Sequence, residues 1–233
     1  METKRTLNNL VLIKLDPENT SVKLKNGMDL YIDTSYDTEK HSTVTGEVWG
    51  LPSHLSYFGE GNRGMPWLTP MEIRMGDKAI IYYLAVINAL KKENKKFIIE
   101  GKDRYIFVPY SSVYAVIRGE NIIPLNGYCL IEAIEDPSIT SDKESFKKIG
   151  MELIVGARRS NSHVTYGRVK YVGTPNREYV DEDYTDEGCD VRVGDVVVIR
   201  KTNDIPLQYS LHAKIDGGAK YLRVQRRNLL AKI

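Results

Sequence analysis

Cysteine and histidine are both scarce in this chain of 233 residues, which has two cysteines and four histidines. Cys129 and Cys189 cannot form a disulfide framework, so the sequence favours a reducing compartment and two small buried side chains. The histidines are scattered and show no short ligand spacing. We therefore expect neither a metal site nor stabilisation by disulfides.

The sequence also lacks an excess of charge and a long apolar run. Its 33 basic residues nearly balance 31 acidic ones, giving a net charge of +2. This balance argues against nucleic acid as the main partner. The longest nearly apolar run, Ala79 to Leu90, is too short to cross a bilayer, and no apolar signal segment precedes the first expected strand. A cytoplasmic protein without a membrane span is expected.

Catalytic motifs are missing as well. Gly59 to Gly64 fits the letters of a dinucleotide fingerprint, but Pro52 lies shortly before it and Met65-Pro66-Trp67 follows in place of a helix. A loop explains this segment better. With no nucleophile elbow, phosphate loop or convincing carboxylate pair, we predict that the chain is not an enzyme.

One short pattern occurs twice. Lys25 to Ile32 and Lys148 to Val155 both contain Gly-Met, an acidic residue and Leu, within long polar stretches. A small apolar tag in an exposed segment is typical of a segment that orders on a partner. The alternative is that Met28, Leu30 and their counterparts pack in a strand of the protein's own core.

Further repeats follow in the same order along the chain. They comprise the apolar runs Leu10 to Pro17 and Leu130 to Pro137, then Thr45 to Val48 and Tyr166 to Val169, then Ile73 to Ile81 and Val191 to Ile199, and last Tyr105 to Ile117 and Tyr221 to Ile233. This order predicts two tandem domains, residues 7–117 and 122–233, joined by Arg118 to Asn121.

The composition of each repeat predicts an all-β fold. Short β-branched runs are broken by Gly, Asp and Pro, and sustained helical periodicity is absent, as in a small β-barrel. The exception is an insertion, Leu84 to Lys96, in which Leu84, Ile87 and Leu90 could share one face of a helical turn.

With these residues in hand, each half resembles a GroES-type co-chaperonin subunit, and the chain resembles a tandem double-domain form. The resemblance rests on the opening strand, the tagged loop, the Gly-Glu-Val or Gly-Arg-Val strand, the Gly-Asp turn and the closing strand. It implies two GroES-like β-barrels, each with a mobile loop and a roof hairpin. The roof segments would be Ser53 to Thr69 and Asn176 to Gly188.

The resemblance also implies a function: the mobile loops dock on a GroEL-type chaperonin and cap the chamber in which a client folds. ATP is then bound by the partner, and this chain needs no cofactor. The tags have an acid in the middle, unlike the family, so the register could instead be Leu30-Tyr31-Ile32 and Leu153-Ile154-Val155. The implied chaperonin-binding residues are Gly27, Met28, Asp29, Leu30, Ile32, Gly150, Met151, Glu152, Leu153 and Val155.

Binding by such tags has to be multivalent. Burying two apolar side chains yields about 3 to 6 kcal/mol, whereas each ordered loop residue costs about 1 to 2 kcal/mol. Several tags presented together overcome this cost. The resemblance accordingly implies a ring-like homo-oligomer, with subunits pairing through edge strands. The expected edge residues are Leu10, Leu12, Leu229, Ala231 and Ile233. The alternative function is an oligomeric structural or assembly protein whose loops bind another partner.

Overall fold

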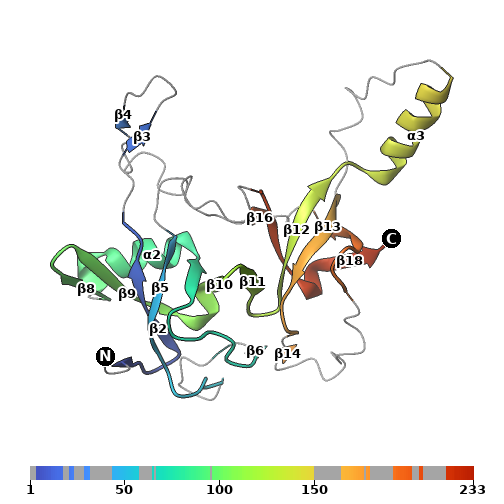
Figure 1. The fold of residues 1–233 in the computed structure, drawn as a ribbon. Coiled ribbons are helices and arrows are strands. Elements are labelled where there is room, and N and C mark those ends of the chain that lie inside the picture. The colour runs from blue at the N-terminus through green and yellow to red at the C-terminus, as the bar shows by residue number, and fades with distance from the viewer. Residues whose placement is uncertain are drawn as a thin grey trace.

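The computed structural model describes twelve segments of the chain and shows an all-β fold with antiparallel sheets (Figure 1). The predicted fold class is confirmed at this level. The described residues are 4–17, 21–23, 29–31, 44–57, 65, 67–94, 96–149, 164–175, 177–178, 191–200, 205–206 and 219–233.

Two large sheets follow one another along the chain. The first contains β1 (Lys4–Arg5), β2 (Leu10–Leu15), β5 (Thr45–Leu51), β7 (Lys78–Ile81), β8 (Phe97–Glu100), β9 (Asp103–Pro109), β10 (Val113–Arg118) and β11 (Asn121–Pro124). The second contains β12 (Tyr128–Ile134), β13 (Val164–Val172), β15 (Val196–Arg200), β16 (Ile205–Pro206), β17 (Leu222–Gln225) and β18 (Leu229–Lys232). We call residues 4–118 the first half and residues 128–233 the second half.

The two sheets have the same strand order. The first runs β10-β7-β5-β2-β9-β8 and the second runs β18-β15-β13-β12-β17-β16. A short 3-10 helix separates the last two long strands in each half, Tyr110–Ser112 in the first and Arg226–Asn228 in the second. The repeat predicted from the sequence is therefore present in the strand topology.

The register of the strands is repeated too. Ile13 pairs with Val48 as Ile131 pairs with Val169, and in both pairs of strands the register shifts immediately before this isoleucine. The structure therefore makes Ile13 and Ile131 equivalent positions of the repeat, separated by 118 residues in the sequence. The sequence alignment of the two Asp-Pro motifs used a spacing of 120, so it is wrong by two residues at this strand. Asp-Pro lies beyond the paired residues and does not fix the register.

A glycine in the following strand explains part of the repeated sequence. A Cβ atom on Gly46 would collide with the backbone oxygen of Lys14 and the side chain of Ile13, and one on Gly167 would collide with the side chain of Ile131. Only glycine fits where these strands approach so closely. This accounts for the shared Gly-x-Val motif.

The predicted Gly-Asp turns are confirmed. Gly76 and Gly194 have φ angles of +81° and +98°, which glycine adopts without steric cost. The carboxylate of Asp77 accepts the backbone N–H of Arg74 at 2.8 Å, and Asp195 accepts that of Arg192 at 2.7 Å. Each turn is thus closed by its own aspartate before the β-branched strand begins.

Two α-helices lie among the described residues, and the sequence predicted only one of them. Helix α2 (Tyr83–Leu90) lies in the expected insertion, but its buried residues are Val86 and Ala89, while Leu84 is exposed. The predicted face was therefore wrong. Helix α3 (Pro137–Lys148) lies where a polar loop was expected. Proline favours the first helical position, and Lys147 and Lys148 in the last turn suit the helix dipole.

One predicted edge is also wrong. Leu10 and Leu12 belong to β2, which pairs with β9 on one side and β5 on the other, so this strand lies inside the sheet. Strand β18 holds Leu229 and Ala231, is followed by Ile233, and ends the second strand order. Parts of both expected roof segments lie outside the described residues. In the parts that are described, β6 (Trp67–Leu68) pairs with β14 (Arg177–Glu178), so strands from the two halves meet.

Candidate partner-binding segments and the junction between the halves

Each of the two predicted binding segments connects a pair of strands, and the two pairs are equivalent in the repeat. One connects β2 with β5, and the other connects β12 with β13. Their described parts are the hairpin of β3 (Ser21–Lys23) and β4 (Asp29–Tyr31), and helix α3. Figure 1 shows the hairpin and α3 on the same side of the molecule, away from β6 and β14. The two segments are therefore oriented so that one partner surface could meet both.

Two of the predicted binding residues lie in β4. Asp29 pairs with Lys23 and Leu30 pairs with Val22, in a two-stranded sheet separate from both large sheets. The other predicted binding residues lie outside the described residues, namely Gly27, Met28, Ile32, Gly150, Met151, Glu152, Leu153 and Val155.

Ile149 is an apolar residue at this site that the sequence analysis passed over. It directly follows α3, and 67% of its surface is exposed. Its backbone N–H is bonded to the carbonyl of Phe146 at 3.1 Å. This places one exposed apolar side chain directly before the predicted tag in the sequence. The signal in the sequence was its place directly before Gly150 and Met151.

A second feature is the apolar junction between the halves. Ile80, Tyr114 and Ala115 of the first half pack with Leu130 and Tyr221 of the second half. Ile122 of β11 is part of the same cluster. The junction could not be predicted from the sequence, because its residues are scattered over more than a hundred positions and share no motif.

Aromatic rings and one arginine complete the junction. The guanidinium of Arg223 lies 4.0 Å from the ring centre of Tyr114 and 5.6 Å from that of Tyr82. The ring of Tyr128 meets Tyr114 edge-on at 5.3 Å. Burial raises the pKa of the Tyr114 hydroxyl, and the nearby Arg223 opposes the rise. A buried cation against an aromatic face strengthens the contact beyond simple apolar packing.

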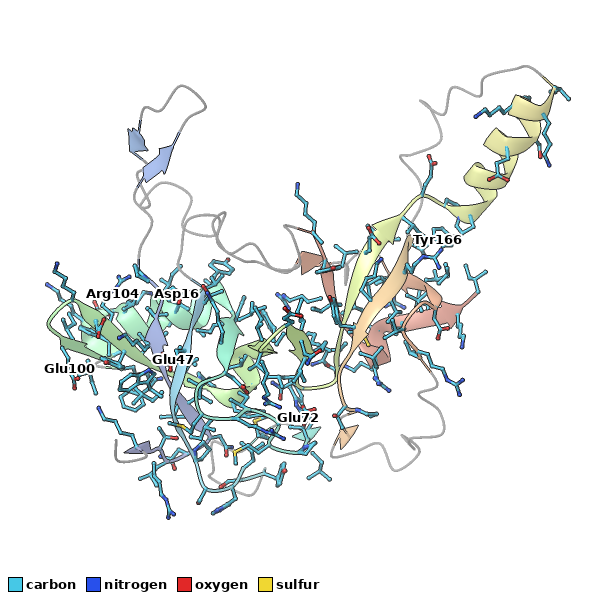
Figure 2. All side chains as sticks on the ribbon, viewed as in Figure 1. Asp16, Glu47, Glu72, Glu100, Arg104 and Tyr166 are labelled. Atoms are coloured by element: carbon cyan, nitrogen blue, oxygen red, sulfur yellow. The ribbon has the colours of Figure 1, made fainter. Side chains whose placement is uncertain are left out.

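Polar contacts cross the junction at its rim. The hydroxyl of Thr174 in the second half donates to Glu72 Oε1 in the first half at 2.5 Å. Beside it, Trp67 Nε1 donates at 3.4 Å to Oδ1 of Asn126, which lies in the connection between the halves. Figure 2 shows Glu72 between the two halves. Burial raises the pKa of the Glu72 carboxyl, against the opposing effects of Thr174 and Arg118. Glu72 Oε2 is buried and has no hydrogen-bond partner among the described residues.

The described residues include no group of three histidine, cysteine, aspartate or glutamate side chains arranged to hold a metal ion. In the same part of the chain, none of the helices has both the length and the apolar character that crossing a membrane requires.

No protein-family model matches this chain, and no curated protein matches it. The proposals below therefore rest on the sequence and the geometry of the chain itself.

Proposed function

We propose that the chain is a co-chaperonin in which two GroES-like β-barrels, residues 7–117 and 122–233, present segments that bind a GroEL-type chaperonin. The observation that carries the proposal is the shared strand order. Each half also places its longest predicted loop between equivalent strands, β2 and β5 or β12 and β13. In this function the chain caps the partner's chamber and assists ATP-dependent folding, while the partner binds the ATP.

The placement of the segments supports multivalent binding. The described parts of both lie on one side of the molecule (Figure 1). Each apolar tag contributes only a few kcal/mol after the cost of ordering its segment. Two tags on one chain raise each other's effective concentration, and an assembly of several chains adds further contacts. Weak individual contacts also allow release, which a lid that opens and closes requires.

The experiment is a binding assay with a GroEL-type chaperonin, with and without ATP. The proposal predicts nucleotide-dependent binding that weakens roughly tenfold or more when Leu30 and Leu153 are both changed to Ala. Met75→Ala is the matched control, because Met75 is 42% exposed and lies outside both segments. Two results would count against the proposal. The double variant could bind the chaperonin as the wild type does, or it could be unfolded in the absence of the chaperonin, which would make Leu30 and Leu153 core residues.

A second candidate function is an oligomeric scaffold whose segments bind something else. One observation favours it: the first segment contains a β-hairpin and the second contains helix α3. Different local structures suit different partner surfaces better than two identical sites. If α3 deletion abolishes binding to another protein but leaves chaperonin binding unchanged, this candidate is preferred.

A further inference from the structure

The first sheet ends in an open edge strand. Strand β8 is the last in the order β10-β7-β5-β2-β9-β8, and β9 is its one neighbour among the described strands. Figure 1 shows β8 at the end of the first half that lies away from the second half. Ile98 is 38% exposed and Ile99 is 61% exposed, so the two faces of this strand each carry an exposed apolar side chain. An open apolar edge of this kind is a template for pairing with another strand.

The hydrogen-bond pattern shows which backbone groups of β8 face outward. The carbonyl of Lys96 accepts the N–H of Phe107 in β9 at 2.8 Å. Because bonded and non-bonded residues alternate in an antiparallel pair, and the register between β8 and β9 does not shift, the even-numbered residues of β8 are the ones bonded to β9. Phe97 and Ile99 therefore direct their N–H and carbonyl groups away from β9, toward the open edge.

The equivalent edge of the second sheet carries a proline. Strand β16 ends that sheet, and its Pro206 lies opposite Leu222, as Phe97 lies opposite Ile106. Ile106 and Leu222 pair with the two isoleucines that are equivalent in β2 and β12. Pro206 is therefore the counterpart of Phe97. Proline has no N–H to donate, and it protects edges that must not pair, so the two sheets treat the same edge differently.

The outward groups of β8 match those of a second copy. Two copies can pair antiparallel about a two-fold axis at Ile98, which sets Phe97 of each copy opposite Ile99 of the other. Both are residues whose N–H and carbonyl face the open edge, so each of these pairs exchanges two backbone hydrogen bonds. The pairing also covers Ile98 with its own copy and Ile99 with an aromatic ring. The edge is thus complementary to itself in the backbone and in the side chains.

The charges of β8 select this register over its neighbours. With the axis at residue 98, Lys96 lies opposite Glu100 of the other copy, which gives an ion pair at each end of the contact. Moving the axis one residue earlier sets Lys96 opposite an isoleucine, and moving it one residue later sets Lys96 opposite Lys102. Within the chain, Glu100 lies 3.8 Å from the ammonium of Lys4, and both side chains are about half exposed. Glu100 is therefore accessible to a second copy.

We propose that β8 binds β8 of a second copy of this chain, with Ile98 on the two-fold axis and Lys96 against Glu100 of that copy. The contact uses the same patch on both chains, so it closes on itself and joins chains in pairs. It is a different contact from the ring pairing that the resemblance implies, which uses residues of β2 and β18. Four residues of strand make a small contact, so we expect an affinity in the micromolar range. The inference holds whether or not the protein binds a chaperonin.

The first test is disulfide trapping in the full-length chain. Cys129 is buried, and Cys189→Ser removes the other native thiol. Ile98→Cys should give a covalent dimer under mild oxidation at about 100 μM protein, because the axis sets position 98 beside its own copy, with Cβ atoms close enough for a disulfide. Glu100→Cys is the matched control. Its position lies several residues from its own copy in this register, so trapping should be at least about tenfold slower.

The register is tested by mixing two variants. Chains with Lys96→Cys and chains with Glu100→Cys should form a mixed disulfide dimer, because these positions lie opposite each other across the axis. Circular dichroism verifies that each variant is folded. Absence of a dimer from folded Ile98→Cys chains overturns the inference, as does equal trapping of Ile98→Cys and Glu100→Cys.

The second test exchanges the charges in the Ile98→Cys chain. Lys96→Glu alone and Glu100→Lys alone should each slow trapping roughly tenfold, because like charges then face each other at both ends. Mixing the two variants should restore trapping between them, since every charge then faces its opposite. Lys102→Glu is the control, because it makes the same change of charge just beyond the strand. Equal trapping in the separate and mixed variants would show that these residues do not meet.

A proline tests the backbone bonds. Ile99→Pro in the Ile98→Cys chain removes an outward N–H but no bond to β9, which is how Pro206 acts on the edge of the second sheet. It should abolish trapping. Ile99→Val is the matched control, because it keeps the N–H and nearly all of the side chain. Trapping that continues in a folded Ile99→Pro chain would overturn strand pairing at this edge.

Discussion

The two halves have the same strand order, but equivalent strands in them, β10 and β18, are buried to different extents. Tyr114 and Ala115 of strand β10 are buried in the junction with the second half, whereas the four residues of β18 are half-buried or exposed. Tyrosines occupy the covered junction, while leucine and arginine occupy the equivalent open positions. The shared strand order thus depends on the strand register and on glycines where strands lie close together. The residue types on the surface of each sheet depend on whether another part of the protein packs against that surface.

The largest effect should come from a glycine at a close strand contact. Gly46→Ala should destabilise the first half by about 3 kcal/mol, because the added methyl group meets backbone that cannot move aside. Gly167→Ala should cost less, because the added methyl group would lie 3.1 Å from the backbone oxygen of Glu132 and its closest contact is with a side chain, that of Ile131. Urea unfolding of both variants measures the difference. Equal losses would show that the two contacts are equally rigid.

The ion pair at each Gly-Asp turn gives a smaller effect. Arg118 donates two hydrogen bonds to Asp77, at 2.7 and 2.8 Å, and the Asp77 side chain is 3% exposed. Arg118→Ala should cost about 2 kcal/mol, reduced from a fully buried pair because Arg118 is partly exposed. Lys232 lies 3.0 Å from Asp195 in a more open setting, so Lys232→Ala should cost less.

Chemical denaturation of both alanine variants tests this ranking, with Lys102→Ala, at a surface turn, as a control for loss of a charge. Lowering the pH should reduce the stabilisation that Asp195 gives to the second Gly-Asp turn. Hydrogen bonding from Arg192 and Lys232 lowers the pKa of Asp195, so its stabilising contribution is present above the unfolded pKa and is lost as the pH falls through the folded pKa. A larger loss for Lys232→Ala than for Arg118→Ala would contradict the comparison.

The smallest effect concerns Glu72 at the junction. Its pKa is raised by burial, so folding favours the protonated form; this contribution is fully present below the unfolded pKa and is lost as the pH rises through the folded pKa. Glu72→Gln should therefore raise the Tm slightly at neutral pH and flatten the pH dependence. Thr174→Ala serves as the comparison, because it removes the hydroxyl donor and leaves the carboxylate. An unchanged pH profile in Glu72→Gln would contradict the assignment.

Much of the strand framework could be predicted from the sequence. The Gly-Asp turns and the Gly-x-Val strands repeat because backbone angles and close contacts restrict those positions to few residue types. The turns before β2 and β12 were passed over, although Asn8 and Asn126 both have positive φ angles, of 56° and 54°. An asparagine tolerates this conformation, and its presence at both turns was the available signal.

The contacts between segments far apart in the chain could not be predicted. The pairing of β6 with β14 joins residues more than a hundred positions apart, and neither two-residue strand has a pattern of its own. The junction tyrosines carry no motif for the same reason. Helix α3 was missed because its sequence is polar, and its end signals were read as part of a loop. Of the candidate binding residues, Asp29 and Leu30 are placed in a strand, and their role in binding stays a prediction.

The short turn between β10 and β11 is not a place at which the chain can be divided into two stable fragments. Leu125, which follows β11, is fully buried in the core of the first half, and β11 forms the outer strand of that sheet. Cutting the chain at Gly119 would remove the outer strand β11 from the first fragment. It would also leave Leu125 in the second fragment, away from the core in which it is buried. Scission at Gly119 therefore does not give two self-contained halves, and a truncated version would have to carry residues 121–125 with its first part.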